Sequence, residues 1–292
     1  MNAWPNLSEL LLDTGDNIPI GLIGAPLAAG SVTPGACDEA PALLRQTLKR
    51  IARYDINMGR SIFTPVRDRG DLHVEGLSIE EATDPIRSAV EASVGQHTLT
   101  LLPGGNNAIT RPAVLAMGDL GKVGLITLDA HFDMRDLDDG LTNGNPVRAL
   151  IQDGLPGKNI AQIGLAAFAN TAKMHRDAIA AGCLAISIDE VRGAGITSAV
   201  ENAIEHTGHC DALVIDCDVD VIDRSQMPGA PGARPGGMEV TDFFWAVRRL
   251  ARERRTRVID LTEWDPSLDS TDLSALTAAR WVAECIGGFE AR

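Results

Sequence analysis

Short apolar runs alternate with segments of helical periodicity along most of the chain. The apolar runs predict buried strands at Ile18–Gly24, Leu99–Leu102, Val123–Leu128, Ile160–Ile163, Leu184–Ile186, Ala212–Ile215 and Arg257–Leu261. The segments between them predict helices at Pro41–Arg53, Ile79–Val94, Thr171–Ala181, Ser198–His206 and Asp242–Arg254. Ser78 and Glu81 form a capping box for the second helix, and Gly182 is a stop signal for the third. This alternation is typical of one doubly wound α/β domain, with a mostly parallel sheet between helices, over residues 1–292.

Polar or glycine-rich motifs directly follow several of the predicted strands. Gly104-Gly105 comes after Leu102, Asp129 after Leu128, Asp216 after Ile215 and Glu263 soon after Leu261. Ligands of open parallel sheets bind at the carboxyl ends of the strands. We therefore expect these motifs to share one site.

Two acidic motifs carry the chemistry of that site. Asp129, His131 and Asp133 alternate after one strand, and Asp218 and Asp220 alternate after another. Alternate residues of an extended segment project to one side, so each motif can aim its ligands at one point. Carboxylates with one imidazole suit Mn²⁺ or a similar divalent ion, and such an ion would relieve their mutual repulsion. The pattern predicts a hydrolytic site with two metal ions; without metal, one or more acids would have to stay protonated.

Composition narrows the function further. The net charge of −14 excludes a nucleic-acid-binding role, because clustered cations are missing. Apolar stretches are too short for a membrane span, and the five cysteines form no C-x-x-C pair, so we expect a reduced, cytoplasmic protein with Cys217 in its core. Asp223 either joins the acidic cluster or caps the following turn. The Pro- and Gly-rich segment 228–237 forms either a rigid loop over a pocket or a surface excursion.

In their order along the chain, these motifs resemble those of the ureohydrolase family, which comprises arginases, agmatinases, guanidino-acid hydrolases and formimidoylglutamases. The matching residues are Gly24-Ala25-Pro26, Pro34-Gly35-Ala36, Ala40-Pro41, Arg45, Gly104-Gly105, Asp129, His131, Asp133, Asp218, Asp220, Asp223, Pro228-Gly229, Gly236-Gly237, Glu263, Pro266 and Asp269. The resemblance implies a three-layer α/β/α sandwich around a mostly parallel eight-stranded sheet. It also implies assembly as a homo-oligomer, either a trimer or a hexamer.

The same resemblance implies two Mn²⁺ ions bridged by a hydroxide that attacks the carbon of a guanidinium or amidinium group. By this resemblance Asp129 and Asp218 would bridge both ions. Asp133 would serve one ion, and His131 and Asp220 the other. Asp133 would also orient the hydroxide and shuttle its proton, and Glu263 would pair with the cationic head of the substrate.

One position departs from the family pattern. Where the family has Gly-Gly-Asp-His-Ser, this chain has Gly104-Gly105-Asn106-Asn107-Ala108, so Asn107 replaces a histidine ligand of the first metal. Asn107 could ligate through its amide oxygen, leave a water-filled position or leave the metal loosely held. Because neutral oxygen is a poorer ligand than imidazole for transition ions, we expect weaker binding at the first metal position.

The segments Phe132–Arg135 and Thr142–Arg148 resemble the formimidoylglutamase branch. This resemblance implies hydrolysis of N-formimidoyl-L-glutamate to L-glutamate and formamide, a step of histidine catabolism, with Arg135, Asn145 and Arg148 binding the substrate. The two arginines could instead be surface or intersubunit salt-bridge partners. Two other functions stay open: an agmatinase or guanidino-acid hydrolase that releases urea, and a metal-poor, non-catalytic family member with a subunit or regulatory role.

Overall fold

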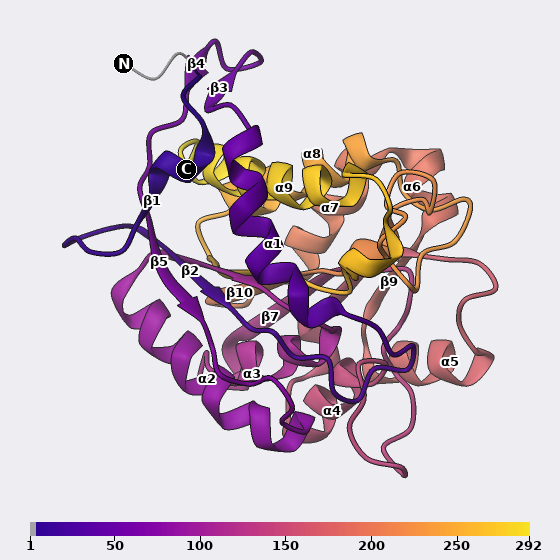
Figure 1. Ribbon diagram of the computed structural model, residues 1–292. Coiled ribbons are helices and arrows are strands. Elements are labelled where there is room, and N and C mark those ends of the chain that lie inside the picture. The colour runs from indigo at the N-terminus through magenta and orange to yellow at the C-terminus, as the bar shows by residue number, and fades with distance from the viewer. Residues whose placement is uncertain (1–3) are drawn as a thin grey trace.

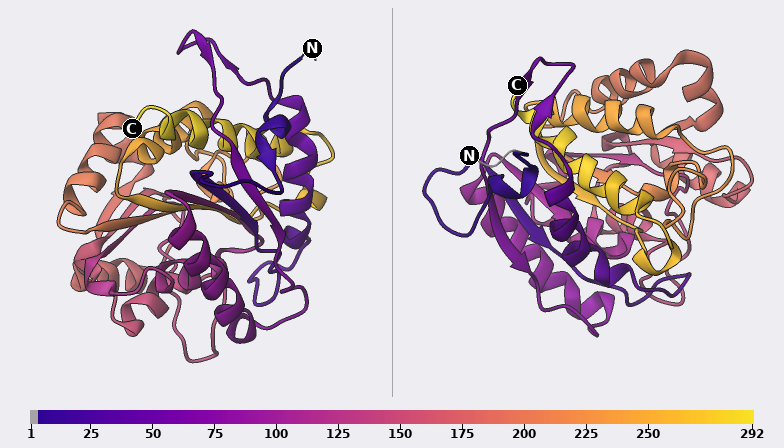
Figure 2. Two further views of the ribbon diagram at one scale, coloured as in Figure 1. Left: turned by 90° about the vertical axis from the view of Figure 1, so that its left-hand side faces the viewer. Right: turned by 45° about the horizontal axis from the view of Figure 1, so that its top comes forward.

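A sheet of nine parallel strands organises the computed structural model, which describes residues 4–292 (Figure 1). In spatial order its strands are β1 (Leu11–Leu12), β5 (Val66–Asp71), β2 (Ile20–Gly24), β6 (Leu99–Pro103), β11 (Thr256–Leu261), β10 (Ala212–Cys217), β7 (Val123–Leu128), β8 (Ile160–Leu165) and β9 (Leu184–Ser187). A separate antiparallel pair, β3 (Tyr54–Asp55) and β4 (Arg60–Ser61), forms a hairpin that projects from the rest of the molecule (Figure 2).

Helices cover both faces of the sheet (Figure 1). One face carries α1 (Ala40–Thr47), α6 (Ile188–Ala194), α7 (Ile196–His206), α8 (Val240–Arg252) and α9 (Leu273–Phe289). The other face carries α2 (Ile79–Gln96), α3 (Thr110–Leu115), α4 (Pro146–Asp153) and α5 (Ala172–Ala181). Short 3-10 helices occur at Leu7–Leu10, Cys37–Glu39, Leu48–Arg50, Asn107–Ile109, Leu120–Lys122, Gly157–Asn159, Val219–Val221 and Pro266–Leu268.

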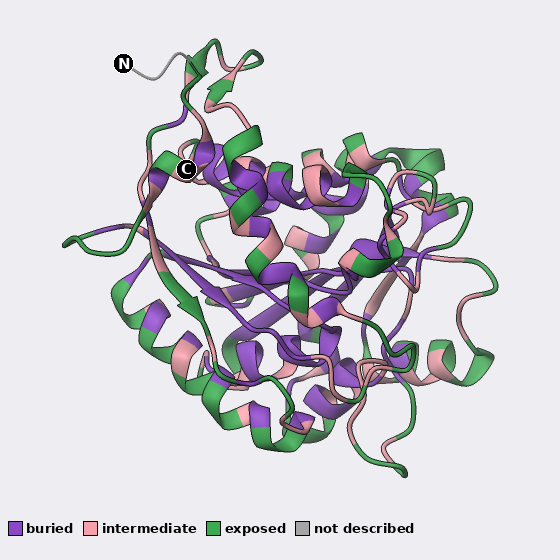
Figure 3. Ribbon diagram, viewed as in Figure 1, coloured by how far each residue is buried: buried purple, intermediate pink, exposed green. Residues whose placement is uncertain are grey.

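Side chains of each central strand alternate between two hydrophobic cores, one on each face of the sheet. In β7, Val123 and Leu125 belong to the core under α2 to α5, whereas Ile126 and Leu128 belong to the core under the remaining helices. The central strands and the inner faces of the helices are buried, whereas the outer helix faces and much of the edge strand β5 are exposed (Figure 3). None of the helices within residues 4–292 combines the length and the apolar character that a membrane crossing requires.

The predicted α/β fold is confirmed, with differences at the edges. Each predicted strand is present, and the capping box at Ser78 and the left-handed stop at Gly182 are both observed. The sheet has nine strands where the resemblance implied eight, because the two-residue strand β1 pairs with β5 at one edge. The elements that were not predicted are the charged strand β5, the short strands β1, β3 and β4, and the helices α3, α4, α6 and α9.

The order of the central strands brings the predicted site motifs together. Strands β6, β11, β10 and β7 are consecutive neighbours in the sheet. Because all four are parallel, their carboxyl ends meet at one edge. Isolated bridges between Ala25 and Gly104 and between Asp218 and Thr262 extend the pairing beyond the strand ends. The glycine-rich and acidic motifs therefore lie side by side.

The close packing of α8 and α9 leads to a stability prediction. A Cβ atom at Gly288 would lie 2.3 Å from the backbone oxygen of Arg248, whereas one at Gly95 in α2 would meet nothing within 4 Å. We expect Gly288→Ala to lower the free energy of unfolding by about 1–3 kcal/mol, because backbone must move. The matched control Gly95→Ala should raise it by up to about 1 kcal/mol. Urea unfolding measures both; equal effects would contradict the packing argument.

Candidate active site

A narrow cavity of about 120 Å³ opens at the carboxyl ends of the central strands. Its lining includes residues predicted for the site, which are His131, Asp133, Arg135, Asp218, Asp220 and Glu263. Asp129 lies fully buried beside His131 and Asp220, so the structure brings both acidic motifs together. The two motifs come from β7 and β10, which pair directly.

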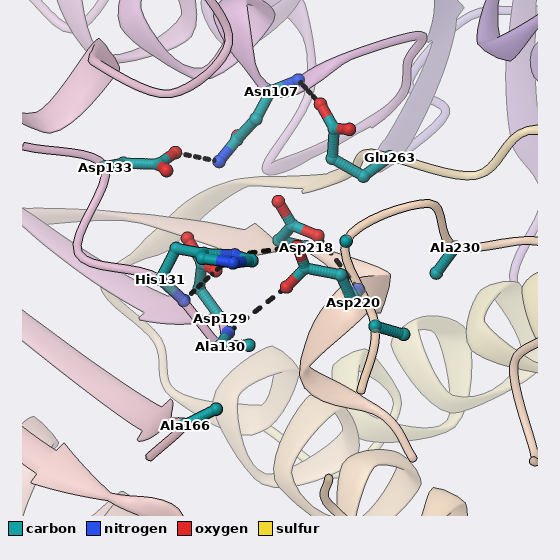
Figure 4. A network of polar contacts seen from close by, with 12 residues as sticks. Asn107, Asp129, Ala130, His131, Asp133, Ala166, Asp218, Asp220, Ala230 and Glu263 are labelled. Carbon is teal, nitrogen blue, oxygen red and sulfur yellow. Dashed lines mark hydrogen bonds and ion pairs between the residues drawn. The ribbon is translucent and has the colours of Figure 1, made fainter. Parts of the chain in front are cut away.

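Asp129, His131 and Asp220 form a cluster whose ligand atoms lie within 4.8 Å of one another. Nδ1 of His131 is 2.9 Å from Oδ2 of Asp220 and 3.6 Å from Oδ1 of Asp129. The second oxygen of Asp129 is buried and has no hydrogen-bond partner among the described residues. Figure 4 shows Asp218 converging on the same point, with Asn107 lying between Asp133 and Glu263.

The electrostatics of this cluster call for a cation. Burial, reinforced by the charge of Asp220, raises the pKa of Asp129 to about 7. Burial likewise raises the pKa values of Asp133 and Asp218 well above the ordinary range. Burial lowers the pKa of His131, but the charges of Asp220 and Asp129 outweigh it and raise the value to about 11. A divalent ion would stabilise the ionised acids, and the unpartnered oxygen of Asp129 is a free ligand for one, so the residues present fit a metal centre.

The side-chain amide of Asn107 faces Asp133 with its nitrogen, not with its oxygen. Its Nδ2 donates to Oδ2 of Asp133 at 2.7 Å, while its Oδ1 accepts from the hydroxyl of Thr110 at 2.7 Å. The amide nitrogen therefore faces Asp133, and the amide oxygen faces Thr110. In this orientation Asn107 presents N–H groups to the acidic cluster, and its oxygen points to Thr110. Asn107 as a metal ligand thus stays a prediction that would require the amide to turn.

Glu263 is held in a conformation that few residues adopt. Its φ is +62°, and Asp133 has a φ of +52°; both are uncommon for residues other than glycine. Oε1 of Glu263 accepts from the backbone N–H of Asn107 at 2.7 Å and from Nδ2 of Asn143 at 2.8 Å. Burial raises the pKa of Glu263 to about 7, although both of these donors act to lower it. The side chain lines the cavity.

Of the three residues predicted to bind the substrate, Arg135 lines the cavity, whereas Asn145 and Arg148 do not. Arg135 is exposed and lines the cavity. Arg148 is absent from the cavity lining; its guanidinium donates to the backbone oxygen of Met134 and pairs with Asp177 at 2.6 Å. Asn145 is buried and holds its own loop, donating to the backbone oxygens of residues 136 and 140. Arg148 is therefore a salt-bridge partner, as the alternative interpretation expected. Asn145 stabilises the loop that contains it.

The Pro- and Gly-rich segment 228–237 lies over the cavity. Pro231, Gly232 and Arg234 line it, and a Cβ atom at Gly232 would lie only 2.0 Å from Oδ2 of Asp220. Asp223 accepts from the backbone N–H groups of Gly236 and Gly237, so it holds this loop as a turn residue. Of the two readings of this segment, the loop over a pocket is the one observed.

Arg234 and Asn143 are polar residues of the cavity lining that were not predicted as site residues. Arg234 is exposed, and its guanidinium also donates to the backbone oxygens of Gly232 and Ala233. A lone cation inside a glycine- and proline-rich segment after the acidic motif was the available signal for Arg234. Asn143 lies in a polar loop sequence, and nothing in that sequence marks it as a site residue.

Comparison with known proteins agrees with this geometry. Formimidoylglutamases of Halalkalibacterium halodurans and Bacillus subtilis are each 28% identical, over 92% of this chain and 86% of theirs. The crystal structure of the Bacillus subtilis formimidoylglutamase is 27% identical with a TM-score of 0.94, covering 99% of this chain and 93% of that one. Trypanosoma cruzi formiminoglutamase with two Mn²⁺ ions is 25% identical with a TM-score of 0.91, covering 99% of both chains. The model of the arginase family matches residues 18–287, and the chain therefore belongs to that family.

Proposed function

We propose that the protein hydrolyses N-formimidoyl-L-glutamate to L-glutamate and formamide. One observation carries the proposal: a single cavity combines the acidic cluster and Glu263 with Arg135 and Arg234. The substrate has a cationic amidinium head and two carboxylates, so it complements both sets of charges. Formimidoylglutamase is also the name of the curated relatives that cover most of this chain.

Asp129, His131, Asp133, Asp218 and Asp220 would hold two Mn²⁺ ions, and the structure of the Trypanosoma cruzi relative contains two such ions. Bound divalent ions supply Lewis acidity and lower the pKa of water. The oxygen-rich donor set with one imidazole suits such ions. Because Asn107 turns N–H groups toward the cluster, it contributes less to the first metal position than the histidine of the family pattern would.

The chain's own residues bind the substrate and move the proton. Glu263 pairs its negative charge with the amidinium and so stabilises the charge of the tetrahedral adduct. Asn107 holds Oδ2 of Asp133, which leaves Oδ1 to accept a proton from the attacking water. Asp133 then delivers this proton to the amine nitrogen of the departing glutamate, and formamide remains.

The substrate's carboxylates need local cations because the protein as a whole has a net charge of −14 and repels anions. Arg135 and Arg234 come from different loops and meet at this cavity. We also propose the finer features implied by the resemblance: a role in histidine catabolism, a cytoplasmic location and assembly as a homo-oligomer. The five cysteines support the location, since all are free thiols and buried.

The direct test is the release of formamide from N-formimidoyl-L-glutamate by the purified protein incubated with Mn²⁺. We expect formamide and glutamate in equal amounts, with activity lost after chelation and restored by Mn²⁺. Agmatine and guanidino acids serve as comparison substrates. Urea from these without formamide from the first substrate would contradict the proposal in favour of a guanidine hydrolase. No turnover of any of them by metal-loaded protein would favour a non-catalytic role.

The cavity predicts different consequences for three arginines. Arg135→Ala and Arg234→Ala should each raise KM for N-formimidoyl-L-glutamate by about 10-fold or more, because each loses hydrogen bonds to a charged carboxylate. Arg148→Ala should leave KM unchanged and lower the melting temperature, since its guanidinium supports the backbone at Met134. Steady-state kinetics and thermal unfolding separate the two effects. An equal rise in KM for Arg148→Ala would refute this assignment.

After metal removal, the free energy of unfolding should fall as the pH rises. The pKa values of Asp129 and Glu263 lie near 7 in the folded protein, against ordinary values of 3.8 and 4.5. The folded protein therefore binds more protons than the unfolded chain between about pH 4 and 7, so its free energy of unfolding falls as pH rises through this window. We expect the chelated protein to be less stable at about pH 8 than at about pH 5, and Mn²⁺ to stabilise it most at the higher pH.

Denaturant unfolding with a chelator or with Mn²⁺ measures these four conditions. The control is Asp129→Asn, which removes one of the raised acids. Its stability should depend less on pH in the chelated state. A chelated protein that gains stability from pH 5 to pH 8 would be inconsistent with a strained acidic cluster.

A further inference from the structure

We propose that Asn143 is a positioning residue, which aims Glu263 at the substrate's amidinium and ties it to the loop of residues 28–33. This inference rests on the proposed function, because it assigns Glu263 to the cationic head of the substrate. Asn143 is neither a metal ligand nor one of the residues expected to bind the carboxylates. Its role follows from three hydrogen bonds.

The first observation concerns the way Glu263 is held. Its carboxylate is buried, and Oε1 accepts two N–H groups, one from the backbone of Asn107 and one from the side chain of Asn143. The backbone donor belongs to the rigid segment after β6. The side-chain donor of Asn143 is the adjustable member of the pair. With Oε1 occupied from two directions, the carboxylate plane is set and Oε2 is left for a cation in the cavity.

The second observation concerns the other side of the Asn143 amide. Its Oδ1 accepts from the backbone N–H of Val32 at 2.8 Å, and its own backbone N–H donates to the oxygen of Gly30 at 3.2 Å. Since Glu263 accepts and Val32 donates, the orientation of the amide is determined by its partners. Val32 also lines the cavity and is 46% exposed. One side chain therefore joins the cavity wall to the cation-binding carboxylate.

The loop has a second support that is independent of Asn143. The Nδ2 atom of Asn106 donates to the backbone oxygen of Ala29 and to the hydroxyl of Ser31, each at 2.8 Å. Loss of Asn143 would therefore leave the loop attached and would change mainly the direction of Glu263. We expect the binding of the cationic head to weaken, whereas the carboxylates of the substrate keep their arginine partners.

Two substitutions separate the two halves of the amide. Asn143→Ala removes both the donor to Glu263 and the acceptor for Val32. Asn143→Asp keeps the acceptor for Val32 but removes the donor and places a like charge beside Glu263. Asn202→Ala is the matched control, because Asn202 is an exposed residue of α7 outside the site.

The readouts are KM and kcat for N-formimidoyl-L-glutamate and the inhibition constants of two ligands. Formamidine carries only the cationic head, and L-glutamate carries only the carboxylate end. Both Asn143 variants should raise KM and the inhibition constant of formamidine by about 10- to 100-fold, the value of a hydrogen bond to a charged group. In Asn143→Asp the inhibition constant of L-glutamate should stay close to that of the unsubstituted protein, whereas kcat should fall, because Glu263 also stabilises the tetrahedral adduct.

The outcomes that overturn the inference are specific. If Asn143→Asp binds formamidine as the unsubstituted protein does, Asn143 acts only on the loop. If both ligands weaken equally in both variants, its role is merely structural. Failure of the proposed function shows separately, because the unsubstituted protein would then release no formamide, whatever the variants do. The Asn202→Ala control should match the unsubstituted protein in every measurement.

Discussion

Mutual repulsion among buried carboxylates is the constraint around which this structure is arranged. Parallel strands that end side by side bring Asp129 and Asp218 together with their neighbours where water cannot screen them. Such a cluster is unfavourable unless protons or cations offset its charge. In the metal-free protein the raised pKa values express this conflict, and His131 supplies only part of the counter-charge. The same repulsion therefore favours binding of the metal ions on which the hydrolytic chemistry depends.

The surrounding loops are shaped by the need to keep this cluster in place. Asp133 and Glu263 have left-handed backbone conformations, and both are held by hydrogen bonds from Asn107. Gly232 lets the covering loop approach Asp220 where any side chain would collide. Strained backbone of this kind persists because many contacts determine it, and it fixes the directions of the Asp133 and Glu263 carboxylates.

Much of this could be predicted from sequence, and the failures have physical reasons. The buried central strands were predicted from short apolar runs, and the acidic motifs from alternating ligand residues at the strand ends, because both leave a local signal. Strand β5 escaped prediction because Val66–Asp71 is mostly charged, and α9 because its largely apolar sequence hides the helical period. Arg234 and Asn143 depend on loop paths, which tertiary contacts decide. The orientation of the Asn107 amide depends on Asp133, which lies in a different segment, and on Thr110.

Asn107 contacts two acidic side chains of the site at once. Its backbone N–H binds Glu263, and its side-chain N–H binds Asp133. A single residue therefore links these two carboxylates of the site. Only the two side-chain torsions of Asn107 lie between these two N–H groups, so a change of its rotamer would alter the position of Asp133 relative to Glu263.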